Sequence, residues 1–190
     1  MTSIEQLHTT EIYRNDWLSL REDAIRRPDG SHGSYAVVDK PAYALVIPLS
    51  GTWVRLVEQY RYPLGRRQWE FPQGTAPERG TTPPTELAAR ELHEETGLRA
   101  ATMTRLGPLD VAPGLSSQRG TAFLATELTA EAPQREHEEQ DMRTAWFARE
   151  EFENLVTAGE ITDSQSLAAY TLLLLHERHS TLQDESRPVP

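Results

Sequence analysis

The chain contains no cysteine, which excludes disulfide bridges, thiolate nucleophiles and cysteine-ligated zinc together. Basic residues are also few: 19 lysines and arginines face 29 aspartates and glutamates, giving a formal net charge of −10. Such a balance argues against a surface that coats nucleic acid, because that surface needs clustered positive charge to release counterions. Anionic small molecules stay open as ligands, since a bound metal ion can supply positive charge locally.

Long hydrophobic runs are missing as well. The run of leucines from Leu172 to Leu175 is far too short to cross a bilayer. The N-terminal residues lack the basic start and apolar stretch of a signal peptide. We therefore expect no membrane association and a cytoplasmic location.

The 190 residues suit one domain, or one domain with a small appendage. Residues 11–40 read as short extended pieces around a hairpin turn at Pro28–Ser34, which predicts a small N-terminal antiparallel sheet. The first eight residues are expected to be irregular. We accordingly divide the chain into a strand-rich extension at 1–41, a main domain at 42–180 and a flexible tail at 181–190.

Hydrophobic patterning in the main domain predicts strands that enclose one helix early and two helices late. Residues 63–84 are rich in proline and glycine and are expected to form a long loop. The arrangement favours an α+β fold or a mixed α/β sandwich. The expected strands are 42–49, 52–62, 104–110, 121–128 and 142–147. One expected helix ends at residue 96, and the two later helices span 149–158 and 163–178.

The stretch "RELHEETGL" at 90–98 gathers Glu91, Glu94 and Glu95 on the helix that ends at residue 96. Thr82 is expected to cap the start of this helix and Gly97 to close it. At about 100° per residue the three glutamates share an arc of roughly 100° that borders the buried face. On the same helical wheel, the outward side carries Glu86, Arg90 and His93.

A solvated helix face is the ordinary explanation for a run of three glutamates. Glutamates three or four residues apart repel one another, however, and the repulsion grows where a partly buried wall lowers the dielectric. Such a cluster either takes up protons or holds a cation. Oxygen ligands without cysteine, and without HExxH spacing, favour Mg²⁺ or Mn²⁺ over zinc.

Gly74 followed by 90–98 resembles the signature of the Nudix hydrolases, which cut a pyrophosphate that links a nucleoside to another group. The second part of that signature, Arg-Glu-apolar-x-Glu-Glu-x-Gly-apolar, fits at every position from Arg90 to Leu98. The first part departs from the family, because two extra residues separate Gly74 from Arg90 and Thr82 stands where the family has a glutamate.

Three further segments, 58–74, 112–126 and 159–174, are similar to ADP-ribose and other nucleotide-sugar pyrophosphatases. The resemblance implies an α/β/α sandwich with a mixed sheet. It also implies Mg²⁺-dependent hydrolysis of ADP-ribose, or of a related nucleoside diphosphate sugar, to a nucleoside monophosphate and a sugar phosphate. Relatives of this branch are commonly homodimers joined through their N-terminal sheets, so a homodimer through residues 9–41 is expected.

The resemblance also implies roles for individual residues. Glu91 and Glu95 would be the principal metal ligands, with Glu94 as a further ligand or a contact to water. The backbone carbonyl of Gln73 would be an additional ligand. Arg90 would belong to the catalytic set by orienting the glutamates.

A loop after the signature supplies a catalytic carboxylate in this branch of the family. Glu136 and Glu138 would serve as the general base and a further metal ligand, and Glu139 is a rival for either role. A solvated acidic loop is the alternative for each of the three. Arg61 and Glu70 look like residues that contact or brace the substrate.

Several alternatives stay open on the sequence. A Nudix-like domain that binds a nucleotide metabolite without cutting it would be a sensor. Hydrolysis of RNA 5′ ends would need a local basic segment such as Arg66–Arg67. A surface ion pair of Arg90 with Glu86 is the alternative to its orienting role. Trp17 is expected to pack within the small sheet.

Overall fold

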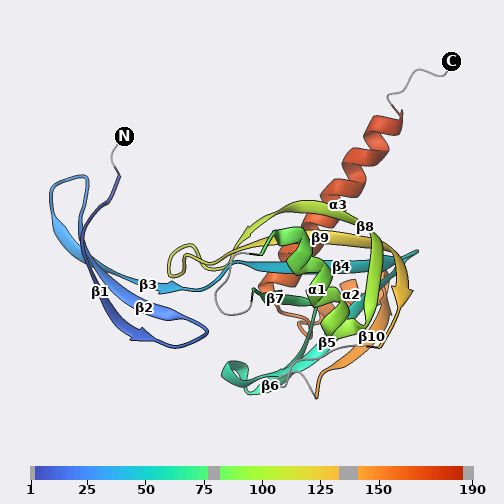
Figure 1. Cartoon of the computed structure of the whole chain (residues 1–190). Coiled ribbons are helices and arrows are strands. Elements are labelled where there is room, and N and C mark those ends of the chain that lie inside the picture. Colours follow the sequence, from blue (N-terminus) through green and yellow to red (C-terminus); the bar gives the residue numbers. More distant parts are fainter. Residues whose placement is uncertain (1–2, 77–81, 133–140, 186–190) are drawn as a thin grey trace. The chain divides into compact units, whose positions relative to one another are not determined.

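The computed structural model describes residues 3–76, 82–132 and 141–185, with side chains to residue 182 (Figure 1). The chain folds into two compact units. The smaller unit contains the N-terminal segment through Tyr43 together with Asp110–Gly120. The larger unit contains most of the remaining chain, including all three α-helices.

The smaller unit is built on an antiparallel sheet in the order β1-β2-β3. Its strands are β1 (Glu5–Arg14), β2 (Ser19–Arg26) and β3 (His32–Asp39). The predicted hairpin turn is confirmed: Gly30 has φ 86° and its N–H donates to the Arg27 carbonyl at 2.9 Å. The expectation of irregular structure in the first eight residues is wrong, because β1 already begins at Glu5 and pairs with β2.

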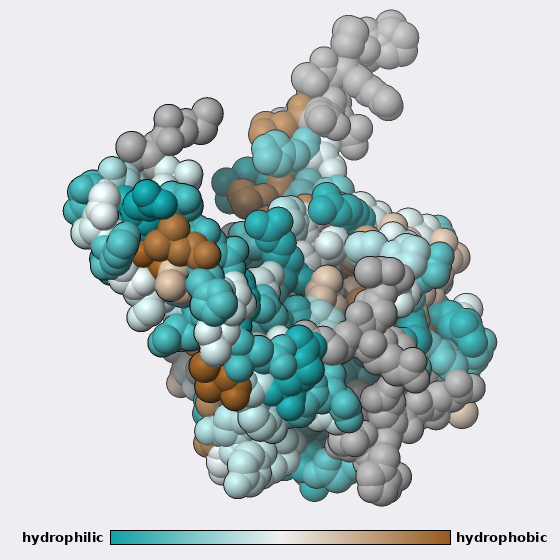
Figure 2. Space-filling model, turned by 60° about the vertical axis from the view of Figure 1, so that its left-hand side comes forward, coloured by the Kyte–Doolittle hydropathy of each residue, from teal (hydrophilic) through white to brown (hydrophobic). Residues whose placement is uncertain are grey.

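Burial is sparse in this small sheet. Every residue of β1 is exposed, whereas Ser19, Asp23 and Ile25 of β2 are buried. Trp17 is 62% exposed, so the expectation that it packs within the sheet is wrong. The face drawn in Figure 2 is largely hydrophilic, with apolar residues gathered in a few small patches.

The end of β3 is joined to a segment that lies far away in the sequence. The Val38 N–H donates to the Leu115 carbonyl at 2.9 Å, and Ser116 Oγ donates to the Val38 carbonyl at 2.8 Å. Ser117 Oγ donates to the Asp39 carboxylate at 2.5 Å. The segment 110–120 is therefore a structural part of the N-terminal unit.

The larger unit is a seven-stranded mixed sheet in the order β10-β5-β4-β9-β8, with β6 paired to β5 and β7 paired to β4. Figure 1 shows α1 in front of this sheet and α2 and α3 behind it, which is the predicted sandwich. No helix in the described ranges is long and apolar enough to span a bilayer. The elements are β4 (Tyr43–Ser50), β5 (Trp53–Arg61), β6 (Arg66–Glu70), β7 (Gln73–Thr75), α1 (Pro84–Thr96), β8 (Leu98–Asp110), β9 (Arg119–Ala130), β10 (Arg143–Ala148), α2 (Arg149–Thr157) and α3 (Ser164–Glu185).

Alternate residues of β4 supply the core on both faces of the sheet, because successive side chains of a strand point to opposite faces. Ala44 and Val46 belong to a buried cluster with Leu92 of α1. A second cluster contains Phe152 of α2, whose ring centroid lies 4.6 Å from Tyr170 of α3. The sheet is thus fixed from both sides.

The expected long loop at 63–84 is wrong in its first half. A 3-10 turn at Tyr62–Leu64 is followed by β6 and β7. The inward positions of β6 are Gln68 and Glu70, both polar and both buried. A strand whose inward side chains are polar lacks the alternation of apolar residues that identifies strands in a sequence.

The boundaries of α1 depart from expectation at one end only. The helix begins at Pro84 with Pro83 as its N-cap, so Thr82 is not the cap. Gly97 closes the helix as predicted, with φ 70° and an N–H that donates to the His93 carbonyl at 2.8 Å. His93 was expected to point outward but is buried, and its Nε2 lies 3.1 Å from a Glu131 carboxylate oxygen.

Candidate active site

The acidic helix α1 buries two of its four glutamates. Glu95 is 1% exposed and Glu91 is 4% exposed, while the Glu94 side chain is 22% exposed. The sequence predicted a stripe that borders the core, and the structure places Glu91 and Glu95 inside it. Burying a carboxylate is costly unless hydrogen bonds or opposite charge compensate, so the surroundings of these two side chains matter.

Glu95 is held against the backbone of β7. The Gln73 N–H donates to Glu95 Oε2 at 3.1 Å. This bond ties the last turn of α1 to the strand that begins at residue 73. The same strand therefore carries the backbone carbonyl that the sequence singled out, and it lies beside the deepest carboxylate of the helix.

Glu91 lies directly over Gly74, the next residue of β7. A Cβ atom at position 74 would overlap the carboxylate of Glu91. Only glycine leaves room there, because every other side chain would displace this carboxylate. The requirement explains why a glycine stands sixteen residues before Arg90, at the start of the signature.

Arg90 lies along the acidic face and contacts two of its glutamates. Its Nη2 is 2.8 Å from Glu91 Oε1, and its Nε is 3.2 Å from Glu94 Oε2. A guanidinium in this position offsets part of the repulsion between the carboxylates and restricts their rotamers. These contacts suit the predicted orienting role of Arg90, which stays a prediction.

The donor set fits a hard divalent cation, which prefers oxygen ligands. Because Gly74 has no side chain, the Glu91 carboxylate can approach the backbone of β7. Glu95 accepts a hydrogen bond from the same strand. Among the described side chains of residues 3–76, 82–132 and 141–182, no three acidic or histidine side chains converge closely enough to hold a metal among themselves. A full ligand set would therefore need a further donor, such as the Gln73 carbonyl, beside the glutamates of α1.

A second buried carboxylate, Glu70 of β6, lies on the strand that precedes β7. It is 1% exposed and accepts a hydrogen bond from Gln59 Nε2 at 2.7 Å and from Arg61 Nε at 3.2 Å. Burial raises the pKa of the Glu70 carboxyl to about 7; Arg61 opposes the rise and the nearby Asp163 adds to it. With its oxygens already engaged, Glu70 is placed to brace Arg61, whose side chain is partly exposed.

Asp163, which precedes α3, is a residue that sequence reasoning missed. Its Oδ2 accepts a hydrogen bond from Gln73 Nε2 at 3.1 Å and another from the Ser166 N–H at 2.8 Å. The second bond is an ordinary helix cap, and "TDSQS" before an apolar run is a recognisable capping pattern. The first bond links α3 to β7 and has no signal in the sequence.

The predicted loop glutamates Glu136, Glu138 and Glu139 lie outside the described residues. The first described residue after them is Asp141. Arg67 Nη1 lies 2.6 Å from its carboxylate, and Arg67 Nε lies 2.8 Å from the carboxylate of Glu58. Arg67 therefore forms ion pairs with two carboxylates of the same chain. That pairing weakens the case for Arg66–Arg67 as a site for RNA.

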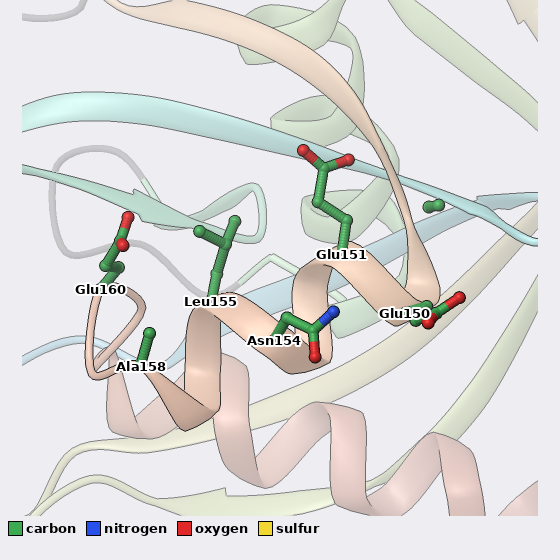
Figure 3. Close-up of a pocket in the computed structure, with 7 residues that line it drawn as sticks. Glu150, Glu151, Asn154, Leu155, Ala158 and Glu160 are labelled. Atoms are coloured by element: carbon green, nitrogen blue, oxygen red, sulfur yellow. The ribbon is translucent and has the colours of Figure 1, made fainter.

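Another acidic surface lies on α2, where a cavity of about 410 Å³ opens beside the helix (Figure 3). Figure 3 shows its carboxylates projecting from α2 and from the turn that follows. Of the predicted site residues that the structure describes, none lines this cavity. The lining residues are Ala148, Glu150, Glu151, Asn154, Leu155, Ala158 and Glu160.

Two family models match this chain. Residues 40–170 match the model described as the NUDIX domain, and residues 4–38 match the nucleoside diphosphate sugar hydrolase N-terminal domain. An ADP-ribose pyrophosphatase of Mycobacterium tuberculosis is 40% identical over 168 residues, covering 87% of this chain and 78% of that protein. An ADP-ribose pyrophosphatase of Bacillus subtilis is 28% identical over 181 residues, covering 93% of this chain and 97% of that protein.

The fold is also similar to that of a solved structure, the crystal structure of an ADP compounds hydrolase. The TM-score is 0.81 at 18% sequence identity, and the match covers 99% of this chain and 98% of that chain. At this level of identity the likeness concerns the fold. It extends over both sheets, because nearly the whole of each chain is included.

Proposed function

The chain belongs to the Nudix hydrolase family, and from that premise we propose that it hydrolyses ADP-ribose or a related nucleoside diphosphate sugar. The observation that carries the proposal is the burial of Glu91 and Glu95 against the backbone of Gln73–Gly74. Carboxylates that serve only solubility have no reason to be buried against a strand. The names of the two related pyrophosphatases support the class of substrate.

In the proposed reaction, water attacks one phosphorus of the diphosphate and the bridging oxygen leaves with the other. ADP-ribose and one water would yield AMP and ribose 5-phosphate. Mg²⁺, or Mn²⁺ in its place, would neutralise the phosphate oxygens and lower the pKa of a bound water. The protein's part is mainly positioning and electrostatics, as in other phosphoryl transfers.

Glu91 and Glu95 are the proposed principal ligands, Glu94 a further ligand or water contact, and the Gln73 carbonyl an additional ligand. Arg90 keeps the glutamates oriented through its contacts to Glu91 and Glu94. These assignments use only oxygen donors, which suits a hard cation.

Among residues 133–140, which lie outside the described ranges, we keep Glu136 as the proposed general base and Glu138 as a further ligand, with Glu139 as the rival. Arg61 is the proposed substrate contact on the adjoining hairpin, since its guanidinium is partly exposed and can approach an anion. Glu70 is proposed to hold Arg61 in place from the buried side.

We also propose that two copies of the chain associate through the N-terminal sheet. β1 is exposed along its whole length, and Ile12 and Tyr13 leave more than half of their surface open to solvent. An open strand edge with exposed apolar side chains is a usual place for pairing with another chain. Light scattering should give about twice the single-chain mass of 21.5 kDa, and the mass of one chain would contradict this part.

The direct test of the proposed function is incubation with ADP-ribose and Mg²⁺, followed by identification of AMP and ribose 5-phosphate. Glu95→Gln serves as the matched inactive variant. Tight binding of ADP-ribose without products would instead indicate the sensor function. A panel of nucleoside diphosphate sugars, with capped RNA as a competitor, would define the substrate.

A further inference from the structure

The start of α3 is fastened to the strand segment that runs from β6 into β7. The Phe71 N–H donates to Ser166 Oγ at 2.9 Å, and Ser166 is fully buried. Gln73 Nε2 donates to Asp163 Oδ2 at 3.1 Å. Two side chains from one helical turn thus hold two positions of the strand that lie two residues apart.

The same segment is held from its other neighbours as well. The Gln73 N–H donates to Glu95 of α1, and the Val46 N–H of β4 donates to the Pro72 carbonyl at 2.9 Å. Gly74 is confined by the carboxylate of Glu91. The peptide that follows Gln73 is therefore fixed by α1 on one side and by the first turn of α3 on the other.

We propose that Asp163 is a positioning residue that acts through the Gln73 side chain to hold the Gln73 carbonyl in place for a divalent cation. The proposal rests on the proposed function, in which that carbonyl is a ligand. Asp163 serves two purposes with one carboxylate oxygen, because Oδ2 also caps α3 through the Ser166 N–H. The position of β7 is in this way coupled to the start of a helix whose first turn is ninety residues away in sequence.

Residues that hydrogen-bond to a metal ligand and fix its orientation are commonly almost as important for metal binding as the ligand itself. Loss of such a partner typically lowers metal affinity or activity about 10- to 100-fold. A backbone carbonyl has no rotamers of its own, so its direction depends on how its strand is held. The tie between Gln73 and Asp163 is the one contact in this set made by the ligand residue's own side chain.

The test uses Gln73→Ala, which removes the tie to Asp163 and leaves the backbone N–H and carbonyl of residue 73 and the cap of α3. Mn²⁺ is the probe, with the free ion followed by electron paramagnetic resonance. We expect Mn²⁺ affinity to fall about 10-fold or more, and kcat for ADP-ribose to fall with it. The KM for ADP-ribose should change less than kcat.

Asp163→Ala should reproduce the loss of affinity, and Asp163→Asn should restore most of it, because the amide oxygen can accept both hydrogen bonds. The matched control is Thr162→Val. It removes the hydrogen bond that Thr162 donates to Gln68 and the one that it accepts from Arg66 of β6, and it leaves Gln73 unchanged. Its Mn²⁺ affinity should equal that of the parent.

Parental Mn²⁺ affinity and kcat in both Gln73→Ala and Asp163→Ala would overturn the positioning role while leaving the proposed function intact. An equal loss in Thr162→Val would also overturn it, since the effect would then belong to the whole helical turn. A parent protein that binds no Mn²⁺ and yields no AMP would overturn the proposed function and this inference together. Thermal midpoints for all four variants separate lost positioning from lost folding.

Discussion

Two helices of the larger unit carry clustered glutamates, and their surroundings differ. On α1, Glu91 and Glu95 are buried and lie against the backbone of β7. On α2, Glu150 and Glu151 are exposed at the rim of an open cavity (Figure 3). α1 carries four glutamates and one arginine, and α2 carries three glutamates and one arginine, so the sequence alone makes both helices acidic. Burial against a strand backbone is what separates a candidate site from a solvated surface.

The largest effect expected from this comparison concerns the buried pair. Glu91→Gln and Glu95→Gln should each lower kcat by about 100- to 1,000-fold, because metal-assisted catalysis is worth several kcal/mol. Glu95→Gln should keep the parental thermal midpoint, since its amide oxygen can still accept the Gln73 N–H, whereas Glu91→Gln also gives up the ion pair with Arg90 and should lower it. Steady-state kinetics and circular dichroism check both statements. Parental rates in both variants would remove the distinction between the two helices.

The next effect concerns the glycine beneath Glu91. Gly74→Ala places a methyl group where the Glu91 carboxylate lies, so either the carboxylate or β7 must move. We expect a loss of about 1–3 kcal/mol in unfolding free energy from overpacking. Activity should fall more steeply than stability, because the displaced group is a proposed ligand. Gly51→Ala, at a turn where a Cβ meets nothing within 4 Å but φ is 59°, is the control for backbone strain without a clash. Urea titration and kcat are measured for both.

Glu70 offers a test of burial itself. Its pKa is raised to about 7 in the folded protein from the usual value of 4.5. A raised pKa means that the folded state binds the proton more tightly, so this group's contribution to stability is full below pH 4.5 and is lost as the pH rises through 7. Between about pH 5 and pH 8 the parent should therefore lose about 1–3 kcal/mol that Glu70→Gln does not lose.

The measurement is the unfolding free energy of both proteins at several pH values. The two proteins are compared by the slope of their unfolding free energy against pH. The substitution also alters the contact with Arg61 and so shifts the absolute unfolding free energy. Parallel curves for parent and variant would show that Glu70 titrates as an ordinary exposed carboxyl.

The smallest effect is expected on α2. Glu151→Gln and Glu150→Gln should leave kcat within about 2-fold and the unfolding free energy within about 0.5 kcal/mol, as for surface substitutions in general. The same assays that detect the Glu95→Gln loss apply here. A loss of activity from either α2 variant would show that the cavity beside α2 takes part in function and would erase the contrast between the helices.

Much of this arrangement was accessible from the sequence. The spacing of 90–98 located the acidic face of α1, and Gly97 located its end. The resemblance to Nudix hydrolases is confirmed by the family match over residues 40–170. The helical wheel placed the three glutamates beside the buried face, but it put His93 on the outward side, where the structure buries it. A wheel cannot tell how far neighbouring elements cover a helix. Glu91 and Glu95 are for that reason more deeply buried than expected.

The contacts that were missed share a physical cause. Gln68 and Glu70 are buried polar residues, and Asp163 meets Gln73 across ninety positions of sequence. Hydrophobic periodicity reports only apolar burial, and spacing rules report only local neighbours. A buried carboxylate with dedicated partners resembles a loop residue until the partners are known. The buried polar contacts of the site are therefore the part that the sequence did not predict.

The join between β3 and residues 110–120 bears on how this chain can be cut. The predicted boundary after residue 41 is crossed by hydrogen bonds of Val38 and Asp39 to Leu115, Ser116 and Ser117. Deleting the first forty-one residues would strip that distant stretch of the backbone partners it pairs with. The N-terminal sheet is therefore completed by residues encoded 78 positions later.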